Sequence, residues 1–301
     1  MRFFAWKENF AKADPMIVEN RPLPMFLCRV LAARGIADGA AAREFLNCSQ
    51  PLCDPMLLHE MEKAVTIVRR AIDEGKKILV FGDYDCDGIT ATVMLYEYLE
   101  GEGADVCYYI PERLGEGYGL SMQTMEMIIS SGIELIITVD NGISAVEEIA
   151  RAKEAGIEVV VTDHHALPQQ MPPADALVNS AFEEDSSPSR YLCGAAMAFK
   201  LIAALEQQMQ GEDAQELLLE QYGDLAAIAT LADVVPLTGE NRTLARMGLE
   251  ILAHTDRPGL KALAQNAKAD LTACHSDTVS FMLAPRINVT GRIGSVDTAV
   301  Q

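Results

Sequence analysis

From residue 76 onward, the hydrophobic positions of the chain alternate between short continuous runs and longer amphipathic stretches. The short runs are rich in Val and Ile and predict β-strands, over residues 78–81, 106–110, 135–139 and 159–162. The longer stretches predict helices, over residues 90–100, 122–131 and 144–155. Strands that alternate with helices of this length indicate βαβ units and an α/β fold with a mostly parallel sheet. Because the strands are apolar at nearly every position, we expect helices to flank both faces of the sheet.

A helical pattern broken by prolines precedes this alternating region. Short helices are predicted over residues 23–34, 39–46 and 59–74. The segment shows no grouping of reactive side chains. We therefore interpret residues 1–75 as an N-terminal helical cap on the domain that contains the sheet.

The chain becomes helical again after residue 188. Helices are predicted over residues 194–209, 214–222 and 225–232. Most of the remaining sequence also follows a helical period, with interruptions at Pro258 and Pro285. The pattern divides the chain into three parts, an N-terminal cap (1–75), an α/β domain (76–240) and a C-terminal helical extension (241–301). The last residues lie in a predicted helix without a C-cap signal, so we expect the sequence to be truncated within a longer structure.

Composition limits the class of protein. Half of the 301 residues are hydrophobic, which indicates a folded globular chain. The seven cysteines are scattered without a Cys-x-x-Cys pair, as is typical of reduced thiols and not of a structural zinc site. The first residues lack the apolar core of a secretory signal, and no apolar run approaches the roughly 20 residues of a membrane helix. We therefore expect a cytoplasmic protein with no membrane association.

The net charge of −20 does not suggest a nucleic-acid-binding protein, because such surfaces are usually basic. The charge is unevenly distributed, however. Residues 241–301 contain seven Lys or Arg and five Asp or Glu, whereas the first 240 residues carry a net charge of −22. Much of this acidic character is expected to be solvated surface that keeps the protein soluble.

Acidic and imidazole side chains follow three of the predicted strands, and a fourth acidic motif ends a predicted helix. In chain order these are Asp83, Asp85 and Asp87 after the first strand; Asp140 after the strand at 135–139; Asp163, His164 and His165 after the strand at 159–162; and Asp233 after the helix at 225–232. Ligands of open parallel sheets bind outside the carboxyl ends of the strands. We therefore expect these side chains to meet at one edge of the sheet.

Aspartate and histidine without thiolates favour hard or borderline divalent ions such as Mn²⁺ or Mg²⁺. Five carboxylates at one edge would repel each other strongly if nothing neutralised them. Two divalent cations about 3.5–4 Å apart would neutralise them and hold the oxygens of an in-line phosphoryl displacement. The sequence thus predicts a site for two ions.

Each motif also has a structural interpretation. The three aspartates of the first motif could form a solvated turn that caps the next helix, and Asp140 could belong to a simple Asp-Asn-Gly turn. A lone histidine is usually structural, and Asp233 could merely end its helix. An EF-hand calcium loop is excluded, because the twelfth position counted from Asp83 is Met94 and not glutamate. The four motifs together favour a functional site.

In this order and spacing, the four motifs resemble those of the DHH phosphoesterase superfamily. Three further segments are similar to the RecJ-type single-strand DNA exonuclease branch of that family, at residues 81–88, 109–119 and 284–292. The likeness extends over essentially the whole chain. It implies that residues 76–240 form a DHH catalytic domain, and that the chain ends before a second lobe that closes over DNA.

The resemblance implies two Mn²⁺ or Mg²⁺ ions as cofactors. Their ligands would be Asp83, Asp85, Asp87, Asp140, His164 and Asp233. One ion would be held by Asp83 or Asp85 with Asp140, and the other by Asp87, Asp140, His164 and Asp233, so that Asp140 bridges both. Which of the first three aspartates binds which ion stays open. As catalytic residues, His165 would contact the scissile phosphate and Asp163 would orient a neighbouring histidine.

Six further residues are candidates for substrate binding: Arg113, Tyr118, Gly194, Arg286, Asn288 and Arg292. The first two lie in a glycine-rich loop, which is either a wall of a DNA groove or an ordinary surface loop. Gly194 opens a helix, where a small residue lets backbone N–H groups approach a phosphate or allows close helix packing. The last three belong to a loop-like segment after Pro285, and arginine is the preferred bidentate ligand of phosphate.

The resemblance implies stepwise hydrolysis of single-stranded DNA from the 5′ end, releasing 5′-mononucleotides in DNA repair and recombination. One alternative is a DHH phosphodiesterase of small substrates, such as oligoribonucleotides or cyclic dinucleotides, although those proteins lack the long cap and the segment 285–292. Another is a catalytically inactive DNA-binding scaffold of the same fold, although that lineage has lost metal ligands that this sequence retains. The expected partners are single-stranded DNA and, by family analogy, replication or repair proteins such as single-strand-binding protein.

Overall fold

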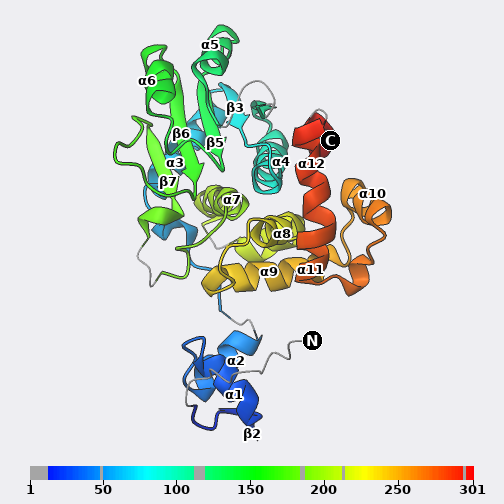
Figure 1. Ribbon diagram of the computed structural model, residues 1–301. Helices are drawn as coiled ribbons and strands as arrows, with labels where there is room; N and C mark the ends of the chain where they lie inside the picture. Colours follow the sequence, from blue (N-terminus) through cyan, green and yellow to red (C-terminus); the bar gives the residue numbers. More distant parts are fainter. Residues whose placement is uncertain (1–12, 48–49, 112–118, 184–186, 212–213, 294–295) are drawn as a thin grey trace, which may run out of the picture. The chain divides into compact units, whose positions relative to one another are not determined.

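The structure is a computed structural model of the 301-residue chain (Figure 1). It describes residues 13–47, 50–111, 119–183, 187–211, 214–293 and 296–301. The contacts between residues divide the chain into two compact units, Met1–Pro51 and Leu52–Gln301.

The smaller unit combines a short ribbon with two helices. It contains an antiparallel pair of strands, β1 (Ile17–Val18) and β2 (Arg21–Pro22), and two helices, α1 (Met25–Ala32) and α2 (Gly39–Asn47). Its core consists of four buried side chains, Met16, Cys28, Leu31 and Ala42. The sequence predicted both helices but not the ribbon, because strands of two residues leave no hydrophobic period to detect.

The larger unit is built on a five-stranded sheet. Its strands are β3 (Lys77–Phe81), β4 (Asp105–Tyr109), β5 (Leu135–Val139), β6 (Glu158–Asp163) and β7 (Ala176–Asn179). They lie in the order β4-β3-β5-β6-β7, and every neighbouring pair is parallel. The predicted parallel sheet flanked by helices is confirmed. The sequence did not predict β7, whose four residues form too short an apolar run.

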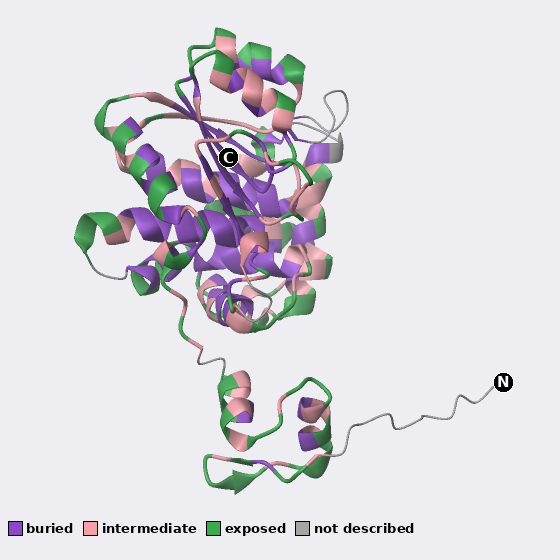
Figure 2. Ribbon diagram, turned by 90° about the vertical axis from the view of Figure 1, so that its left-hand side faces the viewer, coloured by how far each residue is buried: buried purple, intermediate pink, exposed green. Residues whose placement is uncertain are grey.

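Helices cover both faces of this sheet. One face packs against α3 (Met61–Asp73), α4 (Cys86–Gly101) and α7 (Gly194–Gln210), and the other against α5 (Met122–Ser130) and α6 (Val146–Glu154). Alternate residues of β3 divide between the two cores, with Val80 on the first face and Phe81 on the second. Figure 2 shows the buried strands between helices whose outer faces are exposed. Each fully buried Val, Leu or Ile side chain contributes about 1.5–3 kcal/mol to such a core.

Two further helices pack against each other at a pair of glycines. These helices are α8 (Gln215–Ala232) and α9 (Gly239–Leu252). A Cβ atom on Gly248 would lie 2.1 Å from the carbonyl oxygen of Gly223, so the two backbones approach as closely as glycine permits. The sequence predicted a break in α8 near Gly223. The helix is continuous there, because this glycine serves a close helix contact and not a turn.

The C-terminal part of the chain is almost entirely helical. It contains α10 (Pro258–Ala267), α11 (Ser276–Thr278), the π-helix η4 (Val279–Leu283), α12 (Ala284–Ile293) and α13 (Asp297–Val300). Three short 3-10 turns complete the chain, η1 (Pro55–Leu57), η2 (Ser180–Phe182) and η3 (Leu271–Ala273). The loop expected after Pro285 is instead the helix α12. Proline is tolerated there because it stands at the second position of α12, directly after a π turn in which the regular hydrogen-bond ladder is already interrupted.

The boundary of the N-terminal unit also differs from the expected cap of residues 1–75. Helix α3, which the sequence analysis assigned to the cap, lies in the core of the larger unit, where Met61, Val65 and Val68 are fully buried. The division between the units falls after Pro51. An amphipathic pattern shows that a helix has an apolar face, but it does not show which partner covers that face.

A fully buried ion pair joins several elements of the larger unit. Lys200 on α7 and Glu240 on α9 are in contact, and neither side chain is exposed. The Nζ of Lys200 also donates to the carbonyl of Cys53 at 2.7 Å and to Oε1 of Gln215 at 2.8 Å. Glu240 accepts hydrogen bonds from the N–H of Cys53 at 2.9 Å and from the hydroxyl of Ser189. The pair therefore ties the segment before α3 to the first turns of α8 and α9.

We predict that Glu240→Ala lowers the free energy of unfolding by about 3–5 kcal/mol, because Lys200 is then a buried charge without a counter-ion. The double variant Lys200→Met/Glu240→Leu removes both charges and should cost less than the single change. Urea denaturation followed by circular dichroism measures both. Lys261→Ala removes an exposed ion pair with Asp256 and is the control, with an expected loss below about 1 kcal/mol. Equal losses for Glu240→Ala and Lys261→Ala would contradict the prediction.

Candidate metal centre

The predicted site lies where the strand order of the sheet reverses. Strand β3 has β4 on one side and β5 on the other, and ligands of such sheets bind at the carboxyl ends of the strands beside this point. Asp83 follows β3 by two residues, Asp140 follows β5 directly, and Asp163 is the last residue of β6. We call this carboxyl edge of β3, β5 and β6 the rim. It brings three of the four sequence motifs together.

Asp140 has a backbone conformation that few side chains adopt. Its φ is +61°, in the left-handed region, and Gly142 follows at +104°. The side chain of Asn141 stabilises the turn, because its Nδ2 donates to the carbonyls of Val139 at 2.9 Å and Phe81 at 3.4 Å. The bond to Phe81 crosses from β5 to β3. It therefore fixes the turn that carries the Asp140 carboxylate relative to the neighbouring strand.

The N-terminus of α7 binds Asp87. This residue lies in the first turn of α4 and is 2% exposed. Its two carboxylate oxygens accept the N–H groups of Gly194 and Ala195, each at 2.7 Å. The positive end of the α7 dipole thus stabilises the negative charge of Asp87. The Gly194 N–H, which the sequence analysis considered for a phosphate, is bound to a carboxylate of the protein.

Gly194 also lets Asp140 approach the start of α7. A Cβ atom on Gly194 would lie 2.4 Å from Cβ of Asp140 and 2.6 Å from its Oδ1. No side chain fits in that space without moving the carboxylate. Of the two interpretations of Gly194, the geometry supports close packing.

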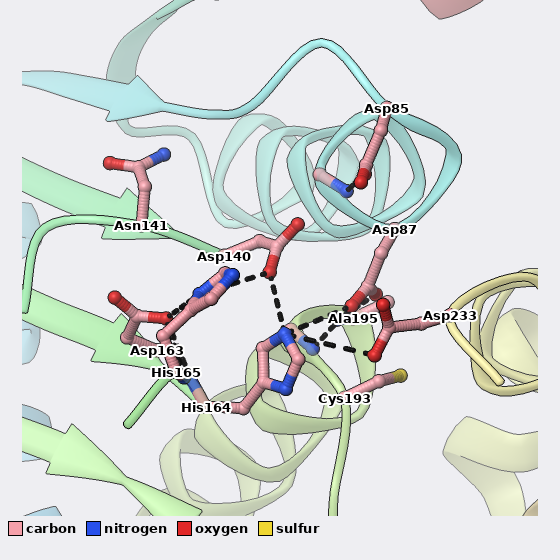
Figure 3. A network of polar contacts seen from close by, with 12 residues as sticks. Asp85, Asp87, Asp140, Asn141, Asp163, His164, His165, Cys193, Ala195 and Asp233 are labelled. Carbon is pink, nitrogen blue, oxygen red and sulfur yellow. Dashed lines mark hydrogen bonds and ion pairs between the residues drawn. The ribbon is translucent and has the colours of Figure 1, made fainter. Parts of the chain in front are cut away.

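His164 lies among three carboxylates, with Asp140 on one side and Asp87 and Asp233 on the other (Figure 3). Its Nε2 is 3.0 Å from Oδ1 of Asp140, 3.7 Å from Oδ2 of Asp87 and 3.9 Å from Oδ2 of Asp233. Asp233 comes from the end of α8, so the fourth sequence motif also reaches the rim. One imidazole nitrogen cannot hydrogen-bond to three carboxylates at once, whereas a divalent cation can bind all four side chains.

Asp163 holds His165. Oδ1 of Asp163 lies 2.7 Å from Nδ1 of His165, and it also accepts the N–H groups of His164 at 2.7 Å and His165 at 3.1 Å. Its Oδ2 accepts the N–H of Ile143 at 3.0 Å. Burial acts to raise the pKa of Asp163, but the hydrogen bonds and charge of His165 outweigh it, so the pKa lies below its usual value. The same hydrogen bond raises the pKa of His165.

Asp83 and Asp85 lie in the loop between β3 and α4. Oδ1 of Asp85 accepts the N–H of Gly88 at 3.0 Å and caps α4. Asp83 is 2% exposed, and its Oδ1 has no hydrogen-bond partner among the residues that the structure describes. The same holds for Oδ1 of Asp140, which lies 3.0 Å from His164 Nε2 without hydrogen-bond geometry. Buried carboxylate oxygens without a donor are costly, and a cation would supply the missing partner.

Three groups of side chains in the described part of the chain could each hold a metal ion. They are Asp83 with Asp85 and Asp140; Asp87 with His164 and Asp233; and Asp140 with His164 and His165. Within each group, the ligand atoms lie within 4.8 Å of one another. The first two groups share no residue and together contain all six predicted ligands. Oxygen and imidazole ligands of this kind suit divalent ions such as Mn²⁺, and the position of Asp140 between the groups fits a bridging ligand.

Burial and mutual repulsion raise the pKa of these aspartates. Burial and the charge of Asp85 raise the pKa of Asp83 to about 7, and burial and the charge of Asp87 raise that of Asp233 to about 6. Burial, followed by the charge of Asp87, also raises the pKa of Asp140 well above its usual value. The physical cause is the same throughout, since several negative charges share a space with little water. Divalent cations would displace the protons that these carboxylates otherwise retain.

Among the remaining substrate-side candidates, the structure describes the side chains of Arg286 and Asn288, and both bind backbone groups of the protein. Nη1 of Arg286 donates to the carbonyl of Met282 at 2.6 Å, and its side chain lines a cavity of about 580 Å³ between α4, α10 and α12. Oδ1 of Asn288 accepts the N–H of Cys86 at 2.6 Å. Arg113 and Tyr118 lie outside the described residues, as does the side chain of Arg292. Their contacts with DNA stay predictions.

The sequence analysis missed two groups that support the site. The backbone N–H of Ala195 binds Asp87. The small residues at this helix start indicated N–H groups that could approach a phosphate, but not that a carboxylate of the chain accepts them. The side chain of Asn141 carries a signal that could have been used, because asparagine in a turn commonly hydrogen-bonds to nearby backbone.

Residues 77–230, just over half of the chain, match the DHH family, N-terminal domain. The chain therefore belongs to the DHH family. It is also similar over most of its length to particular members of that family, the RecJ exonucleases.

The single-stranded-DNA-specific exonuclease RecJ of Bacillus subtilis is 40% identical over 285 residues, which cover 94% of this chain and 35% of that protein. RecJ of Escherichia coli is 35% identical over 286 residues, which cover 92% of this chain and 49% of that protein. The chain thus spans about a third to a half of the length of these curated relatives.

Two solved structures share the fold. A crystal structure of exonuclease RecJ bound to manganese has a TM-score of 0.74 and 36% identity, and the match covers 83% of this chain and 62% of that one. RecJ from Thermus thermophilus in complex with Mn²⁺ has a TM-score of 0.75 and 32% identity, with 90% and 37% covered. Both matches agree with the parallel sheet and its flanking helices.

We predict that Gly194→Ala weakens Mn²⁺ binding by about 10- to 100-fold, because the added methyl group displaces the Asp140 carboxylate. Isothermal titration calorimetry at about pH 7.5, above the raised pKa values of the site, measures the affinity. Gly101→Ala is the matched control, since a Cβ atom at that helical position meets nothing within 4 Å. Equal Mn²⁺ affinities for the two variants would show that the close approach of Gly194 and Asp140 does not matter.

The raised pKa values also predict how stability depends on pH. A carboxyl group whose pKa is higher in the folded than in the unfolded state favours the folded protein at low pH. This contribution is complete below the pKa of the unfolded state, about 4, and is lost as the pH rises through the pKa of the folded state. For Asp83 and Asp233, the pKa of the folded state is about 7 and about 6, respectively, so their contributions are lost as the pH rises through these values. We therefore expect the Tm of the metal-free protein to fall between about pH 5 and about pH 8.

Added Mn²⁺ should then raise the Tm more at about pH 8 than at about pH 5, because it neutralises carboxylates that are ionised only at the higher pH. Differential scanning fluorimetry measures both effects. Asp83→Asn should reduce the pH dependence of the metal-free Tm, whereas the exposed control Asp256→Asn should leave it unchanged. A Tm gain from Mn²⁺ that is the same at both pH values would refute this account.

Proposed function

We propose that this chain is the catalytic part of a single-strand-specific DNA exonuclease that hydrolyses phosphodiester bonds with two divalent ions, Mn²⁺ or Mg²⁺. The observation that carries the proposal is the pair of ligand groups on one rim, with Asp140 placed between them. The similarity to RecJ proteins, including one bound to manganese, supports the choice of substrate and ion. Because the chain spans only part of those relatives, the proposal concerns the chemistry of the rim.

Six side chains would hold the two ions: Asp83, Asp85, Asp87, Asp140, His164 and Asp233. When bound, the ions lower the pKa of water to supply a nucleophile at neutral pH and offset the charge of the phosphate. The chain contributes a fixed geometry. Asp87 is held by the N-terminus of α7, Asp140 by its turn, and Asp85 by the first turn of α4.

Asp163 and His165 would act on the substrate from beside the ions. Asp163 fixes the His165 ring through Nδ1, which leaves Nε2 as the atom that would donate a hydrogen bond to a phosphate oxygen. His165 is the more exposed of the two histidines, as expected for a group that meets the substrate. Its raised pKa favours the protonated ring, which would stabilise negative charge on the phosphate.

The contacts with the rest of the strand are proposed from the resemblance. Arg113, Tyr118 and Arg292 would line the path of the DNA. Arg286 would have to release the Met282 carbonyl before it could reach a phosphate. Gly194 is not among these contacts, because its N–H donates to Asp87. Cleavage from the 5′ end to release 5′-mononucleotides follows the same resemblance.

The proposed setting is DNA repair and recombination in the cytoplasm. In the part of the chain that the structure describes, no helix is both long and apolar enough to cross a membrane. The cysteines of the described residues are free thiols. Single-stranded DNA is the proposed substrate, and single-strand-binding protein or other replication or repair proteins are proposed partners by family analogy.

We predict that the protein releases labelled mononucleotides from a single strand of about 30 nucleotides in the presence of Mn²⁺, and that a chelator abolishes the reaction. Strands labelled at the 5′ or the 3′ end determine the direction, and a duplex of the same sequence should be cut much more slowly. A dinucleotide is the discriminating substrate. Faster hydrolysis of the dinucleotide than of the strand would favour the small-substrate phosphodiesterase, and absence of all hydrolysis would favour the inactive scaffold.

Substitution of the shared ligand tests the two-ion rim. Asp140→Ala should lower kcat/KM by at least about 100-fold, because the group with Asp83 and Asp85 loses a carboxylate and His164 of the other group loses the proposed bridging ligand 3.0 Å away. Asp233→Ala should be nearly as damaging, although it lies 93 positions further along the chain. Asp105→Ala is the control, since this exposed residue begins β4 at the opposite edge of the sheet. Activity of Asp140→Ala within about tenfold of the wild type, in excess Mn²⁺, would refute a bridging role.

A further inference from the structure

Helix α12 contacts the metal-binding loop through Asn288. Oδ1 of Asn288 accepts the N–H of Cys86 at 2.6 Å, across 202 positions of the sequence. Cys86 is the first residue of α4, is 1% exposed, and stands between Asp85 and Asp87. The first turn of α4 is therefore held by two side chains, the local cap Asp85 and the distant Asn288.

Gly291 lies three positions further along α12 and packs against the same loop. A Cβ atom on Gly291 would lie 2.9 Å from the carbonyl oxygen of Tyr84 and 3.2 Å from its Cβ. Residues three apart share a helix face, so Asn288 and Gly291 present one surface to the loop. Figure 1 shows α12 alongside α4.

The beginning of the same helical segment contacts the element that carries Asp233. The hydroxyl of Ser280 in η4 donates to the carbonyl of Leu231 at 3.0 Å, in the last turn of α8. Asp233 is the C-cap of that helix. Asn288 lies eight positions after Ser280. In a regular α-helix, eight residues rotate the side chain about 80° beyond two full turns. The π turn of η4 has more residues per turn and reduces this extra rotation, so one segment can contact both α8 and α4.

We propose that the segment η4–α12 is a brace of the metal centre, and that Asn288 and Gly291 are positioning residues for Asp85 and Asp87, not contacts of DNA. The proposal rests on the proposed function of the rim as a metal-dependent phosphodiesterase site. The brace sets the separation between the start of α4 and the end of α8. These two elements supply the ligands that do not follow a strand of the sheet directly.

The need for a brace follows from charge. Asp83, Asp85 and Asp87 lie within five positions of one another, and Asp83 and Asp85 share a ligand group with Asp140, so like charges repel each other in this loop. The sheet holds only the beginning of this loop, where β3 ends. Asn288 holds its other end, at the first amide of α4, and thereby opposes displacement of the loop.

Mn²⁺ binding in the absence of DNA separates a positioning role from a substrate contact. We expect Asn288→Ala to bind Mn²⁺ about 10- to 100-fold more weakly than the wild type. Asn288→Asp keeps an oxygen that can accept the Cys86 N–H and should recover most of the affinity. Val289→Ala is the matched control, since this exposed residue is the next position of the same helix. Unchanged Mn²⁺ affinity in Asn288→Ala would overturn the proposal.

Steady-state kinetics provide a second readout. For a positioning residue, excess Mn²⁺ should restore most of kcat in Asn288→Ala, and KM for the single strand should stay near the wild-type value. A DNA contact would instead raise KM at every Mn²⁺ concentration. A raised KM together with normal Mn²⁺ affinity would assign Asn288 to the substrate and reject the brace.

Gly291→Ala tests the packing of α12 without removing a hydrogen bond. Alanine stabilises a helix more than glycine does, so the substitution should not weaken α12 itself. Weaker Mn²⁺ binding by this variant would therefore come from the steric contact of the added Cβ with the Tyr84 backbone. Gly259→Ala in α10, where a Cβ atom meets nothing within 4 Å, is the control. If Asn288→Ala does not fold, Gly291→Ala tests the brace in its place. Equal affinities for Gly291→Ala and Gly259→Ala would overturn the packing half of the proposal.

Hydrogen exchange of the Cys86 amide keeps this proposal separate from the proposed function. We expect this amide to exchange at least about tenfold faster in Asn288→Ala than in Val289→Ala, with or without activity. If the wild-type protein neither binds Mn²⁺ nor hydrolyses DNA, the proposed function of the rim is refuted. The proposal that η4–α12 is a brace would then be tested by hydrogen exchange of the Cys86 amide alone. Equal exchange in the two variants would reject it.

Discussion

The carboxylates of Asp87, Asp140 and Asp233 converge on His164 in a space largely closed to water, and their mutual repulsion has to be offset there. Burial, followed by the negative charge of Asp87, raises the pKa values of Asp140 and Asp233. A fold that merely placed these residues together would lose stability. The arrangement is tolerable only with counter-charges, and the surrounding elements supply part of them.

The protein's own compensation comes from backbone. The N-terminus of α7 gives two N–H groups to Asp87, and Gly194 lets that helix end approach Asp140 closely. Asn141 fixes the strained turn of Asp140 by bonding across to β3. These contacts bind the carboxylate of Asp87 and fix the turn of Asp140, but they leave oxygens of Asp83 and Asp140 without hydrogen-bond donors among the described residues. Divalent cations would neutralise the negative charge that the backbone dipoles do not offset.

The rim therefore combines several carboxylates with backbone groups that hold them. Asp163 comes from a strand end and Asp87 and Asp233 from helix ends, which are more precise supports than free loops. A nucleic acid carries its own negative charge, so an uncompensated rim would repel it, and cations would have to bind before a phosphate could approach. A net charge of −20 is therefore compatible with the proposed nucleic-acid substrate.

The parallel sheet and the edge at which the site lies could be predicted from local patterns, because strands alternate with helices and the reactive side chains follow the strands. Asp163, His164 and His165 are adjacent in the chain, so local order was enough to place them. The residues that support the site depend instead on contacts between distant segments. Gly194 meets Asp140, and α12 meets the loop before α4, across separations that no local pattern encodes. A hydrophobic period shows that a face is buried, but the partner of that face is chosen by packing, which depends on the whole chain at once.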